Sequence, residues 1–202
     1  MKKEVVLATR NEGKLAEMQA LLAPLEWKLR PISDYVEDAA AETAPTFIEN
    51  ALLKARYACL VSGLPAIADD SGIEIDALGG APGVISARWS GDDATDSSNN
   101  QKLLRELKGV PDEKRGARYV CVMLYMRSAE DPTPIVSQAI WRGTILHNPK
   151  GGGGFGYDPL FWVPDQKMSA AEMDAGMKNR LSHRGKAAKH LYSLLHDATG
   201  PL

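Results

Sequence analysis

The sequence predicts an α/β fold built on a mixed β-sheet. Strand-like and helix-like segments alternate at both ends of the chain, and a strand-rich middle lies between them. Length alone allows one large domain or two small ones, either of which can bury a hydrophobic core. No internal repeat is visible, and no linker divides the 202 residues.

The amino-terminal segment predicts a strand, a polar turn and a helix in succession. Residues 5–9 (VVLAT) form a short apolar run that is rich in β-branched side chains and stops at the polar residues 10–13. Leucine and methionine side chains then recur at helical spacing until Pro24 closes the pattern.

The next segment predicts a loop, a capped helix and a strand. Residues 33–45 are acidic and rich in alanine, without a clear period, and we expect a loop there. Thr46 and Glu49 have the spacing of a capping box, and Gly63 is expected to stop the helix that they begin. The strand that follows is expected to end at two aspartates, with Ser-Gly (71–72) supplying a turn.

The remaining elements follow from the same patterns. Residues 76–91 are too rich in glycine and too irregular for a helix or strand. After them we expect a helix that begins at the capping candidates Asp96 and Ser97, strands at 117–126 and 135–146, a glycine-rich loop entering a short strand at 151–164, and a last helix after Ser182.

Composition narrows the function classes. The chain is 44% hydrophobic and 25% charged, with a net charge of -2. This charge argues against binding nucleic acid through the phosphate backbone but allows a local cationic pocket. Cys59 and Cys121 lie in apolar stretches, as buried thiols in a reducing compartment do. No apolar run reaches membrane-spanning length or resembles a signal peptide, so we expect a cytoplasmic protein without a membrane partner.

Residues 9–14 (TRNEGK) place polar groups where a strand passes into a helix. The first amides of a helix lack intrahelical partners and, together with the helix dipole, attract anions. A hydroxyl, an amide, a glycine and Lys14 in such a turn suit a polyphosphate, although the spacing is not that of a Walker loop. An ordinary capped turn with a surface lysine is the alternative.

Asp69 and Asp70 follow the apolar strand directly. Because successive strand side chains point to opposite faces, both aspartates serve one site only if the strand is already turning. Carboxylates are ligands for Mg²⁺, and one beside the metal is able to take a proton from an attacking water. A solvated turn is the alternative. Lys54, alone, is read as a surface lysine.

Two later segments suit a planar, electron-rich ligand. In GGGGFGYD (151–158), glycines around Phe155 leave room for a base to stack, and Asp158 is placed to accept hydrogen bonds from it. Core positions for Phe155 and Tyr157 are the alternative. In MKNRLSHRGKA (177–187), cations gather at a helix start, where they oppose the helix dipole. A solvated basic turn is the alternative here.

The order of these motifs resembles that of the inosine triphosphate pyrophosphatase family, in its bacterial dITP/XTP branch. The shared motifs run nearly from end to end: a Thr-x-Asn-x-x-Lys turn, TFIENALLKAR, AIADDSGIEIDALGGAPGVISARWSG, GGFGYDPLF and SHRGKA. Five motifs in one order are more specific than any single one. Arg10 departs from the family, in which a glycine or small residue is common, and its role stays open.

The resemblance implies an elongated two-lobed α/β fold, with helices flanking a mixed sheet and the active-site cleft between the lobes. It implies one domain, 1–202, that hydrolyses noncanonical purine nucleoside triphosphates (dITP, ITP, XTP) to the monophosphate and pyrophosphate and so cleanses the nucleotide pool. It also implies Mg²⁺ as cofactor and a homodimer. Water would attack the α-phosphorus, and no covalent nucleophile is needed.

The resemblance assigns roles to individual residues. Asp70 corresponds to the proton acceptor and to a metal ligand, Asp69 lies beside it in the catalytic motif, and Glu42 supplies a second metal carboxylate. The substrate-binding positions, for phosphates first and the base last, are Thr9, Arg10, Asn11, Glu12, Gly13, Lys14, Lys54, Ser71, Phe155, Gly156, Tyr157, Asp158, Lys178, His183 and Arg184.

The donors among these residues predict selectivity for purines with an oxygen at C6. Inosine and xanthine present an acceptor there, whereas adenine presents a donor. Guanine also carries the C6 oxygen, so its exclusion must come from its 2-amino group. Two other functions are the alternatives. A sibling enzyme for modified pyrimidine or methylated nucleotides is disfavoured by His183 and Arg184. A non-enzymatic nucleotide sensor is disfavoured by the carboxylates of Asp69, Asp70 and Glu42.

Overall fold

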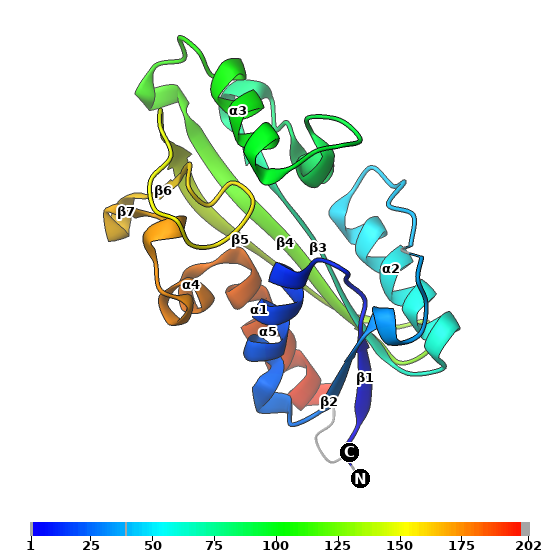
Figure 1. Ribbon diagram of the computed structural model, residues 1–202. Coiled ribbons are helices and arrows are strands. Elements are labelled where there is room, and N and C mark those ends of the chain that lie inside the picture. Colours follow the sequence, from blue (N-terminus) through cyan, green and yellow to red (C-terminus); the bar gives the residue numbers. More distant parts are fainter. Residues whose placement is uncertain (1, 39, 199–202) are drawn as a thin grey trace. The chain divides into compact units, whose positions relative to one another are not determined.

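The computed structural model describes residues 2–38 and 40–198. It contains a sheet with the strand order β2-β1-β3-β4-β5-β6-β7 (Figure 1). The strands are β1 (Glu4–Leu7), β2 (Lys28–Pro31), β3 (Ala66–Ile75), β4 (Gly116–Met126), β5 (Ile135–Ile145), β6 (Phe161–Val163) and β7 (Met168–Ser169). The helices are α1 (Glu12–Leu22), α2 (Phe47–Ser62), α3 (Asp96–Glu106), α4 (Ala175–Leu181) and α5 (His183–Ala198).

The sheet is mixed, and the prediction of an α/β fold is confirmed. β1 pairs in parallel with β2 and with β3, and Val6 of β1 lies opposite Ala66 of β3. β6 pairs antiparallel with β5 and with β7. Short 3₁₀ turns connect several of these elements.

The chain forms two compact units. Unit 1 comprises the described residues of 1–70, 121–139 and 184–202, and unit 2 comprises 71–120 and 140–183. Strands β3, β4 and β5 each contribute residues to both units, so the boundary crosses the strands rather than a linker. No helix within 2–38 or 40–198 is long and apolar enough to cross a membrane.

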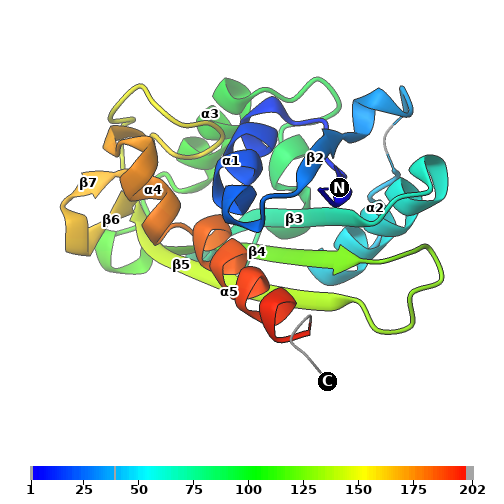
Figure 2. The same cartoon turned by 90° about the horizontal axis from the view of Figure 1, so that it is seen from below.

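In unit 1, α1 and α5 lie close together against one face of the strands (Figure 2). Val5, Leu7 and Ile67 of the strands pack there with α1 side chains such as Met18 and with α5 side chains such as Leu191. The intervening strand residues point to the opposite face, which α2 covers with a row of small buried side chains (Figure 1). Because successive β3 side chains point to opposite faces of the sheet, they alternately face α1 and α5 on one side and α2 on the other.

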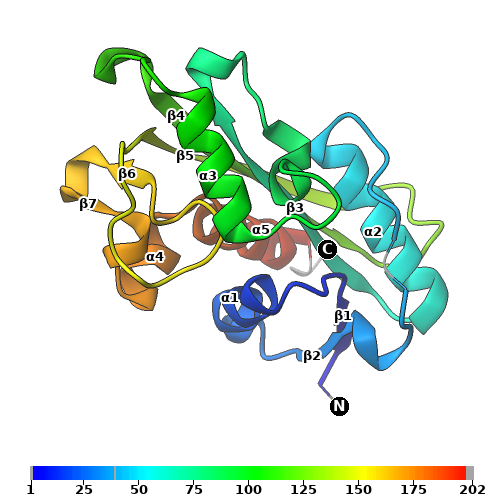
Figure 3. The same cartoon turned by 45° about the horizontal axis from the view of Figure 1, so that its top comes forward.

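In unit 2, an aromatic core is formed by side chains of β4, β5 and β6. Figure 3 shows where these three strands lie. Tyr119, Trp141 and Phe161 are in ring contact, with centroids 4.7 Å apart for Tyr119–Phe161 and 5.0 Å apart for Trp141–Phe161. Leu103 and Leu107 from the α3 region pack into this core. Such tilted aromatic pairs stabilise beyond the area that they bury.

Two predictions about helix starts need correction. The Thr46 hydroxyl accepts a hydrogen bond from Glu49 N, as expected, but the Glu49 carboxylate accepts from that same hydroxyl rather than from a backbone amide. For α3 the cap is Thr95, in a capping box with Ser98, and not Asp96 or Ser97. β2, β7 and α4 are elements that the sequence patterns do not predict.

Candidate active site

The polar turn at 9–14 joins β1 to α1 in unit 1, as predicted. Asn11 is the helix cap: its Oδ1 accepts a hydrogen bond from Lys14 N at 2.9 Å, and its own N–H donates to Thr9 Oγ1 at 3.3 Å. Arg10 and Glu12 are exposed, whereas Lys14 is half-buried and turns toward Asp69. The turn therefore places a helix amino terminus and one lysine beside an acidic strand.

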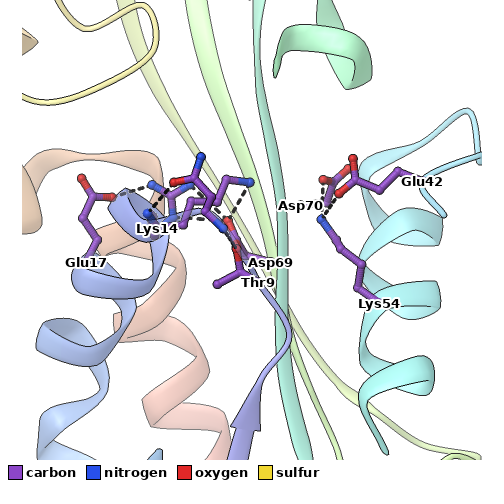
Figure 4. A network of polar contacts seen from close by, with 9 residues as sticks. Thr9, Lys14, Glu17, Glu42, Lys54, Asp69 and Asp70 are labelled. Atoms are coloured by element: carbon purple, nitrogen blue, oxygen red, sulfur yellow. Dashed lines mark hydrogen bonds and ion pairs between the residues drawn. The ribbon is translucent and has the colours of Figure 1, made fainter. Parts of the chain in front are cut away.

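The two aspartates lie within a continuous strand, so the predicted turn at 71–72 is wrong. β3 runs on through Ser71 to Ile75, and Ser71 itself is half-buried. Asp69 and Asp70 therefore point to opposite faces, Asp69 toward α1 and Asp70 toward α2 (Figure 4). The two carboxylates have different partners and different chemistry.

Asp69 is held by cations on its face of the sheet. Its Oδ2 accepts hydrogen bonds from Arg184 Nε at 3.2 Å and Nη2 at 3.1 Å, and Lys14 Nζ lies 3.6 Å away. Burial opposes ionisation, but the positive charges of Lys14 and Arg184 outweigh it and hold the pKa of Asp69 well below its usual range. This carboxylate stays ionised and is unsuited to carrying a proton.

The buried Arg184 guanidinium joins Asp69 to a second acid. Its Nη1 donates to Glu17 Oε2 of α1 at 2.5 Å, and the guanidinium is almost fully buried. Burial disfavours the charged guanidinium, but Asp69 and Glu17 outweigh it and raise the pKa of Arg184. Arg184 therefore stays charged in ion pairs within unit 1.

Asp70 meets Lys54 and Glu42 on the opposite face. Lys54 Nζ donates to Asp70 Oδ1 at 2.7 Å and to Glu42 Oε1 at 2.8 Å. Burial raises the pKa of Asp70, despite the opposing effect of the Lys54 ammonium. Burial would lower the pKa of Lys54, but the carboxylates of Asp70, Asp69 and Glu42 raise it, so Lys54 stays charged. Lys54 is thus a buried ion-pair partner and not a surface lysine.

The carboxylates that face Lys54 fit a hard divalent cation. Asp70 Oδ2 is shielded from solvent and accepts no hydrogen bond from any residue that the structure describes. The structure also brings Glu42 to Asp70, since both bind one ammonium. No group of three acidic, histidine or cysteine side chains suited to a metal occurs within the described ranges. Mg²⁺ needs only one or two protein carboxylates besides phosphate oxygens and water.

In unit 2, the glycine-rich loop is organised around Asp158. Its Oδ2 accepts hydrogen bonds from Phe155 N at 2.9 Å and from Lys178 Nζ at 2.6 Å. Lys178 Nζ also lies 4.6 Å from the Phe155 ring centroid. A Cβ at Gly154 would lie 2.1 Å from the same Asp158 oxygen, so this position requires glycine. The loop, Asp158 and Lys178 therefore form one assembly, and a role for it in base binding stays a prediction.

His183 joins this assembly through an aromatic stack. Its ring lies nearly parallel to that of Tyr119, with centroids 4.6 Å apart and an interplanar angle of 5°. Tyr119 donates from its hydroxyl to Asp158 Oδ1 at 3.4 Å, and burial raises its pKa well above the ordinary tyrosine value. Tyr157 is a core residue whose hydroxyl donates to Ser86 O at 2.8 Å.

Comparison with known proteins decides the family. The family model described as "Ham1 family" matches residues 5–194. The chain belongs to the Ham1 family. The dITP/XTP pyrophosphatase of Shigella flexneri is 55% identical over 194 residues, which cover 96% of this chain and 98% of that protein. The dITP/XTP pyrophosphatase of Yersinia pestis is 53% identical over 195 residues, with coverage of 96% and 99%.

Solved Ham1 structures share the fold. A HAM1 protein from Coxiella burnetii superposes with a TM-score of 0.89 at 46% identity, covering 96% of this chain and 99% of that one. The Staphylococcus aureus Ham1 protein gives a TM-score of 0.86 at 34% identity, covering 98% and 100%. The fold of this Ham1 family member is therefore that of its solved relatives.

Sequence reasoning missed one residue in each of the two side-chain assemblies. Glu17 pairs with Arg184, and Tyr119 links His183 to Asp158. Glu17 lies three residues after Lys14 on α1, a spacing that places both side chains on one helix face and was available as a signal. Tyr119 lies in an apolar strand, where nothing in the sequence separates it from an ordinary core aromatic.

Proposed function

We propose that this Ham1 family chain hydrolyses noncanonical purine nucleoside triphosphates (dITP, ITP and XTP) to the monophosphate and pyrophosphate. Relatives more than 50% identical over nearly their whole length carry the name dITP/XTP pyrophosphatase. This chain also carries the five motifs in the order on which the resemblance depends. The proposal therefore rests on family membership together with the two side-chain assemblies described above.

The assignment of the catalytic base rests on the pKa and the surroundings of the Asp70 carboxylate. Its pKa is raised by burial, and its Oδ2 is shielded without a partner among the described residues. A carboxylate of raised pKa is a better general base near neutral pH than an ordinary aspartate. We assign to Asp70 the removal of a proton from the water that attacks the α-phosphorus.

Asp70 and Glu42 are the residues that would hold Mg²⁺. Both contact the Lys54 ammonium, so their oxygens already share one cation. When bound, Mg²⁺ would neutralise phosphate charge and polarise the phosphorus centre. Lys54 would then offset negative charge on the leaving pyrophosphate, because its own pKa is raised and it stays protonated.

Each unit supplies one kind of recognition. In unit 1, the helix terminus at 9–14 and Lys14 suit phosphate oxygens. In unit 2, the half-buried Phe155 offers a ring face, while Lys178 and His183 offer donors. These donors can form hydrogen bonds with an oxygen at C6 of the purine. Opposite the 6-amino group of adenine, which is itself a donor, they would be left without an acceptor.

Assembly and compartment are further parts of the proposal. We expect a homodimer, and the exposed Leu60 and Val61 of α2 are apolar side chains of the kind that an interface covers. We expect a cytoplasmic location, because Cys59 and Cys121 are both free, buried thiols of the kind found in reducing compartments.

Product analysis tests the proposed function. ITP is incubated with the protein and Mg²⁺, and nucleotides and phosphates are separated by ion-exchange chromatography over time. We expect IMP and pyrophosphate in equal amounts, with a far larger kcat/KM for ITP and XTP than for ATP. Formation of IDP and orthophosphate would contradict the proposed reaction, and equal use of ATP would contradict the proposed selectivity.

A further inference from the structure

Two polar side chains of α3 hold one residue of the glycine-rich loop. Asp96 Oδ2 accepts a hydrogen bond from Gly156 N at 2.6 Å, and Asn100 Nδ2 donates to Gly156 O at 2.9 Å. Asp96 and Asn100 are four residues apart and lie on one face of the helix. The amino-terminal end of α3 lies beside this loop (Figures 1 and 3). Both backbone hydrogen-bonding groups of Gly156 are therefore bound by a single helix.

Neither side chain is needed to build the helix. The cap of α3 is supplied by Thr95 and Ser98, which bond reciprocally. Asp96 is thus available for the loop, although the first turn of a helix also favours its charge. Asn100 Oδ1 accepts no hydrogen bond from the described residues, and its Nδ2 donates to Gly156 O.

The helix itself is anchored independently of the loop. The neighbouring Asn99 is buried, donates from Nδ2 to Ala87 O at 3.0 Å and accepts from Ser90 N at 2.8 Å through Oδ1. The Ser98 hydroxyl also bonds that of Ser90 at 2.6 Å. α3 is therefore a fixed support, and removal of Asp96 or Asn100 leaves these anchoring bonds in place.

The contacts fix the backbone on both sides of the Phe155 ring. Phe155 N donates to Asp158, and the next amide, Gly156 N, donates to Asp96. Gly156 has a φ of +64°, a conformation that a residue with a side chain adopts only with strain. The hydrogen bonds of Phe155 N, Gly156 N and Gly156 O thus restrict the backbone that positions the Phe155 ring.

We propose that Asp96 and Asn100 are positioning residues for nucleobase binding, acting through Gly156 on Phe155. This inference rests on the proposed function, in which the loop of unit 2 binds the purine. Both residues would act through the backbone of Gly156 and not by direct contact with the base or the phosphates. Losing either one frees the loop and weakens binding of the base, while the proton acceptor Asp70 and the phosphate-binding turn keep their own contacts.

Binding and turnover of single variants test the proposal. Asp96→Ala and Asn100→Ala are compared with wild type for the Kd of IMP, by calorimetry, and for kcat and KM with ITP. We expect each variant to raise both the Kd of IMP and the KM of ITP by about 3- to 10-fold, the usual effect of one hydrogen bond. We expect kcat within about twofold of wild type.

Matched variants separate positioning from a general loss of structure. Asp96→Asn keeps an acceptor oxygen and is expected to restore IMP affinity to within about twofold of wild type. Asn100→Asp is nearly isosteric but removes the donor, and it should behave as Asn100→Ala does. Ser97→Ala and Gln101→Ala change exposed neighbours on the same helix and should leave the Kd of IMP unchanged. Melting temperatures identify any variant that fails to fold.

Hydrogen exchange of backbone amides measures directly how well the glycine-rich loop is held, and it requires no ligand. We expect the peptide covering residues 154–158 to exchange hydrogen faster in Asp96→Ala and Asn100→Ala than in wild type. Folded variants with wild-type exchange and wild-type Kd for IMP would overturn the positioning proposal, as would a fall in kcat with KM unchanged. A wild type that neither binds IMP nor hydrolyses ITP would instead overturn the proposed function, and the positioning proposal with it.

Discussion

At the scale of single residues, the two adjacent aspartates are distinguished by their partners. Asp69 is bound by Arg184 and Lys14, which keep its pKa low, whereas the pKa of Asp70 is raised by burial. A low pKa suits a fixed negative charge, and a raised pKa suits a proton acceptor. Strand alternation produces this division, because it sends neighbouring side chains to differently charged faces.

We expect Asp70→Asn to lower kcat for ITP by about 10²- to 10⁴-fold, the usual contribution of a general base. The fold should survive, because Lys54 keeps Glu42 as an ion-pair partner. The matched control is Asp76→Asn, which changes an exposed aspartate just after β3. Steady-state kinetics checks the prediction, and activity within a few-fold of wild type would refute the role of Asp70.

We expect Arg184→Ala to destabilise the fold by about 3–5 kcal/mol, because it leaves Asp69 and Glu17 without their shared buried cation. Lys14 stays near Asp69 and relieves part of this cost. Urea unfolding measures the change, with Arg180→Ala as a control at an exposed position. Equal unfolding free energies for Arg184→Ala and wild type would show that the ion pairs are not structural.

At the scale of elements, the turn that joins β4 to β5 is held by one buried carboxylate. Asp131 accepts hydrogen bonds from Arg127 N at 2.9 Å and Thr133 N at 3.0 Å, and it pairs with the Arg127 guanidinium. The Arg127 hydrogen bond is the largest of the effects that lower the pKa of Asp131. We expect Asp131→Ala to lower the unfolding free energy by about 1–2 kcal/mol, with the exposed Glu130→Ala as control.

The same carboxylate gives this turn a pH dependence of known sign. Because the pKa of Asp131 is lower in the folded than in the unfolded chain, its ionised form stabilises the fold above about pH 4. This contribution is lost as the pH falls below that value. Urea unfolding of wild type and Asp131→Asn at pH 7 and at pH 3 checks it: the difference between them should shrink at pH 3, and a constant difference would contradict the assignment.

Sequence patterns predicted elements better than their ends. Regular apolar spacing located α1, α2, β4 and β5. The strand ending at Asp69 and Asp70 was wrong, because Asp-Asp-Ser-Gly favours a turn locally while the buried Ile73 and Ile75 and the strand's sheet neighbours keep β3 extended. β2 and α4 are short and lack a clear period, so their tertiary contacts rather than their sequences define them.

At the scale of the whole molecule, motif order identified the family, but it did not locate side chains. The expectation that Arg184 serves the base together with His183 came from the resemblance of the SHRGKA motif to the family's. In the structure Arg184 binds Asp69 and Glu17, whereas His183 stacks on Tyr119. A guanidinium's partners depend on which buried acids the fold brings to it, and no local pattern contains that information.

In the proposed mechanism, water attacks the α-phosphorus of the nucleotide. Hydrolysis of ITP in water enriched in ¹⁸O, followed by mass spectrometry of both products, tests this most directly. Attack at the α-phosphorus leaves one labelled oxygen in IMP and none in pyrophosphate, and this is the result that we predict. Label in the pyrophosphate with unlabelled IMP would place the attack at the β-phosphorus and would contradict the mechanism.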